Sequence, residues 1–433
     1  MNAVLRGLWS KAQTPGAWLL ASSLLSRLLG FVASLMVSRT LGVGALGVYS
    51  SLLITAASPT TPLSAVLSNN ATMLAARQRS ASGLWRLFAL HLGLMVVCAA
   101  VALLGCWAML ASSQLLSSPM LPVWSIWLVV AGLVVGQLLT QVVSGLCHGQ
   151  DRSRWVAVST GVVSLLGVVL VWPVLTTFGL LGMAVLATAV MLLPGVLMLW
   201  WSAMRAHATT AEAAAGAAEP VEASTHGVWA AFKQSLPNVG ATVVNNATNW
   251  ICCVYLVSSA HGAQGLGVVA IGLQWMALML LPTISWGGRV MRALTLAHEG
   301  AAPDGLRREL MRQAGYCAGV SLAAGVMVVF ALPWIAQIYK VDVGELSGLF
   351  VLNAAAATLA GINFVLERVY FCLQRQGTWL RVAMVAYAVQ LVATASLISW
   401  SVWAVALGNL IGITLVLLLC GWDLRQRLTV AGR

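Results

Sequence analysis

The chain has 433 residues, of which 60% are hydrophobic and 8% are charged, and its formal net charge is +12. Soluble proteins carry about a quarter of their residues as charged side chains, so this composition excludes a soluble enzyme and, with a mean hydropathy of +0.91, indicates a membrane protein. The basic residues form short clusters between apolar stretches, which argues against nucleic acid as a partner. Cysteine and histidine spacing typical of a metal or redox centre is missing, so we expect no cofactor and no enzyme activity.

Long apolar stretches follow one another along the whole chain. Each is about 20 residues or longer, which suffices for an α-helix to cross a hydrocarbon core of about 30 Å. We therefore predict an all-α polytopic membrane protein with about 12 transmembrane helices. The predicted spans cover residues 16–38, 46–75, 84–110, 121–146, 155–174, 178–200, 228–257, 264–288, 313–338, 346–372, 379–399 and 402–421.

The loops between these spans differ strongly in charge. Most of the 23 Lys and Arg residues fall in alternate loops and in the two termini, whereas the opposite loops hold Arg39 and Lys340. By the positive-inside rule, both termini of this multi-pass protein are predicted to be cytoplasmic.

One long polar stretch divides the chain. Residues 202–227 are rich in Ala, Thr and Glu and are predicted to be a cytoplasmic linker between an N-terminal six-helix lobe (1–201) and a C-terminal six-helix lobe (228–433). A shift of 220 positions also aligns the two lobes near the start of their second spans. The aligned pairs are Gly42 with Gly262, Leu46 with Leu266, Gly47 with Gly267, Val48 with Val268, and Pro62 with Pro282. The pattern indicates an internal repeat, although glycine-rich turns and helix prolines are common in membrane proteins.

The seventh predicted span contains a polar stripe. Its residues recur at helical spacing and fall within about 40° of one helix face; they are Gln234, Asn238, Thr242, Asn245 and Asn249. We interpret the stripe as cavity lining that binds substrate, and the alternative is hydrogen bonding that joins helices. Lys233 lies away from the stripe and serves either as a ligand or as a snorkelling residue.

Arg27 is the one clear charge well inside the first six spans. A guanidinium at that depth costs about 2.5 to 3.5 kcal/mol on insertion scales, and a bound phosphate or pyrophosphate would suit its bidentate fork. The alternative is snorkelling or bonding to helix carbonyls. Gln137 and Gln141 of the fourth span form a further polar stripe and a further candidate substrate site. Glu367 and Arg368 in the tenth span are either a structural pair or a gate.

At these positions the chain resembles the oligosaccharide-lipid (Wzx-type polysaccharide) flippases of the multidrug/oligosaccharidyl-lipid/polysaccharide exporter superfamily. The resemblance extends over nearly the whole chain, and its motifs are degenerate. They are Ser26-Arg27-Leu28-Leu29-Gly30, Ser38-Arg39-Thr40-Leu41-Gly42, Leu46-Gly47-Val48-Tyr49, Ser235-Leu236-Pro237, Gly265-Leu266-Gly267 and Leu281-Pro282. Family members often have several cationic cavity residues, whereas Arg27 is the one clear candidate in this chain.

The resemblance implies two six-helix lobes around a central cavity. It also implies a substrate, an undecaprenyl-pyrophosphate-linked oligosaccharide of O-antigen, capsule or exopolysaccharide, that crosses the plasma membrane by alternating access. The implied partners are this lipid-linked oligosaccharide, membrane lipid, a polysaccharide polymerase and the chain-length machinery. A competing hypothesis is a cation-coupled multidrug exporter, which would place a carboxylate in the membrane, and the first lobe's spans contain no Asp or Glu. A non-transporting membrane scaffold is a further alternative.

Overall fold

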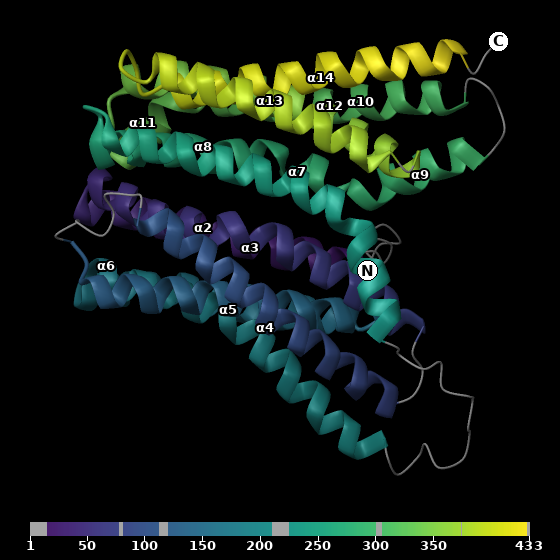
Figure 1. The fold of residues 1–433 in the computed structure, drawn as a ribbon. Coiled ribbons are helices and arrows are strands. Elements are labelled where there is room, and N and C mark those ends of the chain that lie inside the picture. The colour runs from purple at the N-terminus through teal and green to yellow at the C-terminus, as the bar shows by residue number, and fades with distance from the viewer. Residues whose placement is uncertain are drawn as a thin grey trace, which may run out of the picture. The chain divides into compact units, whose positions relative to one another are not determined.

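The computed structural model describes residues 15–77, 81–111, 120–209, 225–299, 305–373 and 375–430, and every regular element in these ranges is an α-helix (Figure 1). This confirms the predicted all-α fold. In chain order the helices are α2 (Pro15–Leu41), α3 (Val43–Arg77), α4 (Ala81–Ala111), α5 (Val123–Gly149), α6 (Ser153–Thr209), α7 (Thr225–Ser258), α8 (Gly262–Ser285), α9 (Gly287–Glu299), α10 (Gly305–Phe330), α11 (Leu332–Tyr339), α12 (Val343–Cys372), α13 (Gln376–Leu397) and α14 (Ala404–Val430).

Ten helices in the described ranges are long and apolar enough to cross a membrane. They include α6 as a single segment of 50 residues, although its sequence was predicted to supply two spans. They do not include α7, which has 34 residues but also carries the polar stripe. A helix satisfies all its backbone hydrogen bonds internally, which is why long apolar segments adopt this structure in lipid. About 12 transmembrane helices therefore remain consistent with the described helices.

Helix α6 is two helices joined at Gly179. This residue has a φ of +58° and a ψ of −143°, a conformation that glycine adopts without the strain a Cβ would add. The two halves fold back on each other, because the ring centroids of Trp155 and Trp201 are 3.3 Å apart and Gly167 lies against Val190. The predicted spans 155–174 and 178–200 are thus confirmed as separate helices.

Two predicted spans were wrong at their ends. The span 264–288 ends as a helix at Ser285, and a separate amphipathic helix, α9, follows with Val290 and Leu294 buried and Arg289 exposed. The span 313–338 is divided between α10 and α11 at Ala331, two residues before Pro333. The five arginines predicted to lie in the loop between these spans are all helical, because hydropathy locates the membrane boundary and not the end of a helix. They are Arg289, Arg292, Arg307, Arg308 and Arg312.

The chain forms two compact units. Unit 1 comprises Met1–Met36 and Leu52–Val239, and unit 2 comprises Val37–Ser51 and Gly240–Arg433. The corner between α2 and α3 thus groups with the second unit. Of the predicted linker 202–227, residues 210–224 lie outside the described ranges, while α6 continues to Thr209 and α7 begins at Thr225.

Small residues bring the helices of each unit together. In unit 1, Gly136 of α5 lies against the backbone of Leu192, and the Thr140 hydroxyl of α5 donates to the Met191 carbonyl at 2.7 Å. In unit 2, Gly325 of α10 lies against Ala354 of α12. Helix association in lipid relies on such close packing and on interhelical hydrogen bonds, because the surrounding acyl chains are as apolar as the side chains.

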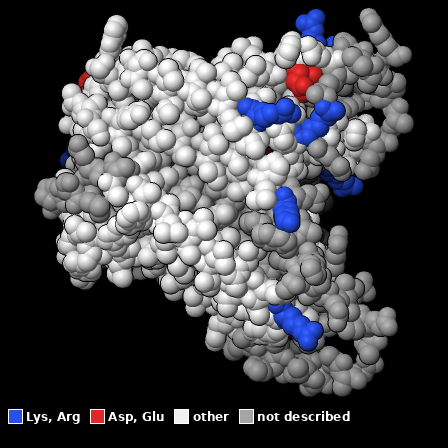
Figure 2. All heavy atoms as spheres, viewed as in Figure 1, with Lys and Arg blue, Asp and Glu red and all other residues white. Residues whose placement is uncertain are grey.

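Basic side chains of unit 1 lie near helix ends. Arg86 is close to the start of α4, and Arg152 and Arg154 flank the start of α6. On the face drawn in Figure 2, most of the described surface is uncharged and few Lys and Arg side chains are seen. The cytoplasmic location of the termini, which rests on the loop charges, stays a prediction.

Candidate functional site

The two copies of the internal repeat meet in unit 2, at the helix corners before α3 and α8. Gly42 and Gly262 each have a positive φ, of 88° and 57°, at the residue before their helix. A Cβ on Gly47 would overlap the carbonyl group of Ala263, and a Cβ on Gly267 would overlap the carbonyl group of Val43. Because 43 and 263, like 47 and 267, differ by 220, the same contact is made twice.

The two helix ends cross at these contacts, and the residues beside the crossing are buried. Leu46 and Leu266 are each 1% exposed beside the two glycines. The Ser38 hydroxyl, at the end of α2, donates to the Tyr339 carbonyl of α11 at 3.1 Å, which fixes the same corner on unit 2. The repeat therefore marks a point where two helix ends approach backbone to backbone, which only glycine permits.

Arg27 lies half-buried on α2 in unit 1. The opposite side of α2 packs on α6, where Ser22 lies against Gly161 and Leu29 against Gly167. At 100° per residue, Arg27 projects about 140° away from Ser22 and about 160° away from Leu29. The guanidinium is therefore on the face of α2 that does not contact α6.

The two glutamines of α5 are also half-buried, and one of them joins α3. Gln137 donates through Nε2 to the Thr61 hydroxyl at 3.3 Å. Gln141 follows one turn later on the same helix. Thr61, which the sequence did not single out, is exposed and adds a hydroxyl to this polar part of unit 1.

The polar stripe of α7 is divided between the units. Asn238 is half-buried in unit 1, whereas Asn245 and Asn249 are half-buried in unit 2. The side chain of Gln234 lies outside the described residues. Asn249 donates from Nδ2 to Oδ1 of Asn245 at 3.0 Å, so the structure brings these two predicted site residues together.

Gln390 of α13 extends this pair into the core of unit 2. Its Nε2 donates to Oδ1 of Asn249 at 2.9 Å, which gives a chain of three amides from α13 to α7. Gln390 is 0% exposed, and Gly412 of α14 leaves the space that its amide occupies. One end of the chain is thus fixed by packing, and the other end, at Asn245, is partly exposed.

The sequence did not single out Gln390. The signal that could have indicated it is a pair of matching spacings: Gln390 and Thr394 are four residues apart on α13, and Gly408 and Gly412 are four apart on α14. Each glycine lies against one of these polar side chains. Polar and small residues at equal spacing on adjacent spans are typical of a hydrogen-bonded helix contact.

Glu367 and Arg368 form an ion pair at 3.3 Å near the end of α12. The Arg368 guanidinium also donates to the Phe364 carbonyl at 2.9 Å and lies over the Phe364 ring, 3.3 Å from its centroid. Three contacts therefore hold Arg368 on its own helix, which favours the structural alternative for this pair. Lys233 of α7 is exposed. Among the described residues, no group of three or more His, Cys, Asp and Glu side chains could hold a metal ion.

Solved structures identify the fold of the chain, whereas sequence comparisons find no relative. No protein-family profile and no curated protein sequence matches the chain. Among solved structures, an inward-facing multidrug resistance MATE family transporter of the MOP superfamily aligns with a TM-score of 0.74 at 15% identity, covering 94% of this chain and 95% of that one. An outward-facing MATE family transporter aligns with a TM-score of 0.67 at 14% identity, covering 96% of this chain and 95% of that one.

A third structure is a MOP superfamily transporter from Pyrococcus furiosus, described as having a binding pocket of reverse polarity that suggests a different function. It aligns with a TM-score of 0.69 at 14% identity, covering 96% of this chain and 95% of that one. The chain is therefore a multi-pass membrane protein with the fold of MATE family transporters. At sequence identities this low, the structural similarity establishes the fold of the chain but not the substrate that it transports.

Proposed function

We propose that this protein is a flippase that moves an undecaprenyl-pyrophosphate-linked oligosaccharide across the bacterial plasma membrane by alternating access. The fold supports transport, because related structures with this fold are described in inward-facing and outward-facing conformations. The motifs around Arg27 and Gly47 support the oligosaccharide-lipid branch of the superfamily. A polysaccharide polymerase and the chain-length machinery would then act on the exported product.

The proposed substrate rests on one observation, which is the charge of the membrane spans in unit 1. They hold Arg27 at a half-buried position and contain no Asp or Glu. A membrane-embedded region with positive and no negative side chains suits an anionic ligand, and a guanidinium binds phosphate oxygens through two parallel hydrogen bonds. The amides of Gln137, Gln141, Asn238, Asn245 and Asn249 can each donate to and accept from sugar hydroxyls.

A cation-coupled multidrug exporter is the second candidate. Glu367 favours it, because this carboxylate lies within a predicted span and such pumps need a group that changes charge during the cycle. Two of the structures with this fold are described as multidrug resistance transporters. However, the Pyrococcus furiosus transporter indicates that pocket polarity varies on this fold, so the charge of the pocket is a better guide to cargo than the fold.

The decisive experiment measures flipping in proteoliposomes with a fluorescent lipid-linked oligosaccharide that carries a pyrophosphate. Arg27→Ala should abolish flipping at matched protein level, and Arg27→Lys should keep part of it because the charge remains while the planar fork is lost. Arg39→Ala is the matched control, since Arg39 is an exposed arginine at the end of the same helix. A wild-type rate in Arg27→Ala would refute the assignment of the pyrophosphate to this residue.

The same vesicles separate the two functions. Cationic dye efflux that depends on an ion gradient, together with no flipping of the lipid-linked oligosaccharide, would establish the exporter and reject the flippase. Flipping without such efflux is the expected result.

A further inference from the structure

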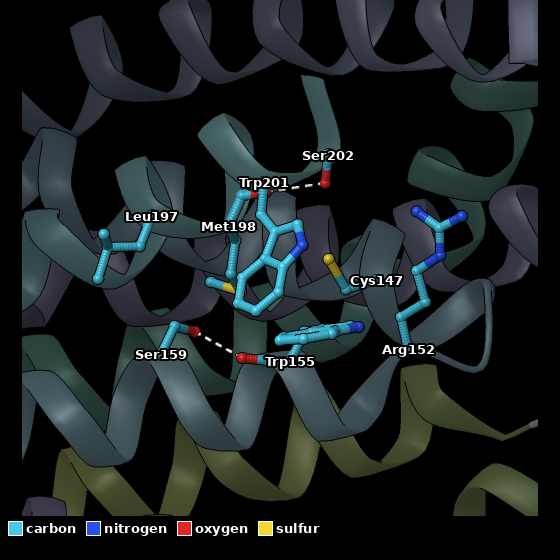
Figure 3. A pocket seen from close by; sticks show the side chains of 8 residues that line it. All are labelled: Cys147, Arg152, Trp155, Ser159, Leu197, Met198, Trp201 and Ser202. Carbon is cyan, nitrogen blue, oxygen red and sulfur yellow. Dashed lines mark hydrogen bonds between the residues drawn. The ribbon is translucent and has the colours of Figure 1, made fainter. Parts of the chain in front are cut away.

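Two helix starts that carry arginines differ in how far a ligand can reach them. In unit 1, a space of about 20 Å³ lies where α5 ends and the two halves of α6 meet, and its lining includes Cys147, Arg152, Trp155 and Trp201 (Figure 3). Because the centroids of the two indole rings are 3.3 Å apart, this space holds about one water molecule and no larger ligand. In unit 2, by contrast, the arginines near the start of α10 are exposed.

The exposed face of α10 is apolar along most of its length. Its buried residues, from Leu306 to Gly325, recur every three or four positions, so they lie on the opposite face, toward the other helices of unit 2. The exposed apolar side chains are Met311, Tyr316, Leu322, Val326, Met327 and Phe330. Such a face, on a helix long and apolar enough to cross a membrane, contacts the acyl chains of lipids.

Arg308 and Arg312 lie where this exposed face begins. At 100° per residue, the two side chains project within about 40° of each other. Arg312 pairs with Glu309 at 2.8 Å, but its side chain is 71% exposed and a guanidinium has five N–H donors, so donors remain for a ligand. Neither of the two ion pairs found among the described residues includes Arg308. The positive charge at this point therefore exceeds the negative charge and favours an anionic ligand.

Two glycines follow the arginines on the same line along the helix. Gly315 and Gly319 project within about 20° of Arg308, and nothing lies within 4 Å of a Cβ added to either glycine. Tyr316 is exposed on one side of this line, and its ring packs on Trp286, with the ring centroids 4.3 Å apart. The glycines thus form a strip of helix surface without side chains, which we call the glycine strip, and an aromatic pair borders it.

We propose that this face of α10 binds an anionic glycerophospholipid of the cytoplasmic leaflet. The phosphate oxygens accept hydrogen bonds from Arg308 and Arg312, and one acyl chain lies along the glycine strip beside the Tyr316 ring. A lipid fits better than a soluble anion, because Gly315 lies about 10 Å along the axis from Arg308 and the face stays apolar from there to Phe330. The positive-inside rule predicts this end of α10 to be cytoplasmic, where anionic lipids attract basic residues. This site is independent of the flippase assignment.

The test is native mass spectrometry of the purified full-length protein with added dioleoyl phosphatidylglycerol. Arg308→Gln should weaken the apparent affinity for this lipid roughly tenfold, as expected for losing a hydrogen bond to a charged group. Arg307→Gln is the matched control and should leave the affinity unchanged, since Arg307 is also exposed but projects about 100° away from Arg308.

A second pair of variants tests the glycine strip without changing the charge. Gly319→Leu should weaken lipid binding roughly tenfold, because the leucine side chain takes the place of about two methylene groups of the acyl chain. Gly93→Leu is the matched control, since Gly93 is an exposed glycine of α4 and nothing lies within 4 Å of its added Cβ. Melting curves of each variant verify that it is folded.

Three further probes identify the ligand. Inorganic phosphate should fail to displace the lipid, because it lacks the acyl chain, and dioleoyl phosphatidylethanolamine, which has no net charge, should bind more weakly than phosphatidylglycerol. Undecaprenyl phosphate should not bind better than phosphatidylglycerol. Equal weakening by Arg308→Gln and Arg307→Gln would overturn the proposal, since binding would then reflect general charge, and so would unchanged binding in Gly319→Leu. Displacement by inorganic phosphate, equal affinity for phosphatidylethanolamine, or Arg308-dependent binding of undecaprenyl phosphate alone would also overturn it.

Discussion

Replacing Gly47 with alanine should open the corner between α2 and α3 from its place on α8. The added Cβ would stand 2.9 Å from the carbonyl carbon of Ala263 and 3.1 Å from the backbone nitrogen of Gly267, and it would overlap the Ala263 carbonyl oxygen. These are backbone atoms, so no side chain can rotate to relieve the overlap. Overpacking of this kind costs about 1 to 3 kcal/mol, which changes the equilibrium between docked and undocked corner by a factor of about 5 to 150.

Opening of the corner can be measured at Ser38, which is 4% exposed and whose hydroxyl donates to the Tyr339 carbonyl. In purified protein, Ser38→Cys should react slowly with a maleimide, and adding Gly47→Ala should raise its labelling rate by the same factor of about 5 to 150. Gly267→Ala should do likewise, because the contact is made twice. Gly44→Ala is the matched control, since nothing lies within 4 Å of its added Cβ. Equal labelling rates in Gly47→Ala and Gly44→Ala would refute the crossing as the contact that holds the corner.

Two further predictions concern unit 2. Gln390→Leu should lower the free energy of unfolding by about 1 to 3 kcal/mol in a denaturation experiment, because Asn249 loses its buried donor; an unchanged free energy would mean that the amide chain contributes nothing to stability. Glu367→Gln should reduce flipping by a factor of about five or less, because the pair with Arg368 is partly exposed and such pairs contribute about 0 to 1 kcal/mol. Loss of ion-coupled efflux in Glu367→Gln would instead support the multidrug exporter.

The all-α fold and nearly all its spans could be predicted because lipid leaves the backbone few choices. An apolar segment that crosses the membrane must form its own hydrogen bonds, so hydropathy and helix coincide there. Outside the hydrocarbon core this link fails, and residues 287–299 and 305–312 are helical although their arginines indicated a loop. The break at Ala331 was missed for a related reason: the segment stays apolar through Leu332 and Trp334, so hydropathy shows no boundary there.

The candidate site could be predicted only one helix at a time. Periodicity placed Asn245 and Asn249 on one face of α7, and the structure shows a hydrogen bond between them. It could not show that Gln390 faces them, because the partner of a helix face depends on how spans from distant parts of the sequence pack. Thr61 was missed likewise, since a single threonine costs little in a membrane helix and shows no periodicity by itself.

The internal repeat shows why the sequence signal was strongest where two helix ends meet. Most positions on a span accept any apolar side chain of suitable size, so two halves can lose their likeness there without structural cost. Few residue types fit at positions 47 and 267, because Gly47 and Gly267 each lie against a carbonyl group of the other half's corner. At Gly42 and Gly262 the choice is narrow for a second reason, since their positive φ disfavours other residues. The aligned pair Gly47 and Gly267 therefore reports a contact between the two corners, whereas Gly42 and Gly262 report a shared turn conformation. Leu46 and Leu266 align with them because both are buried beside the same crossing.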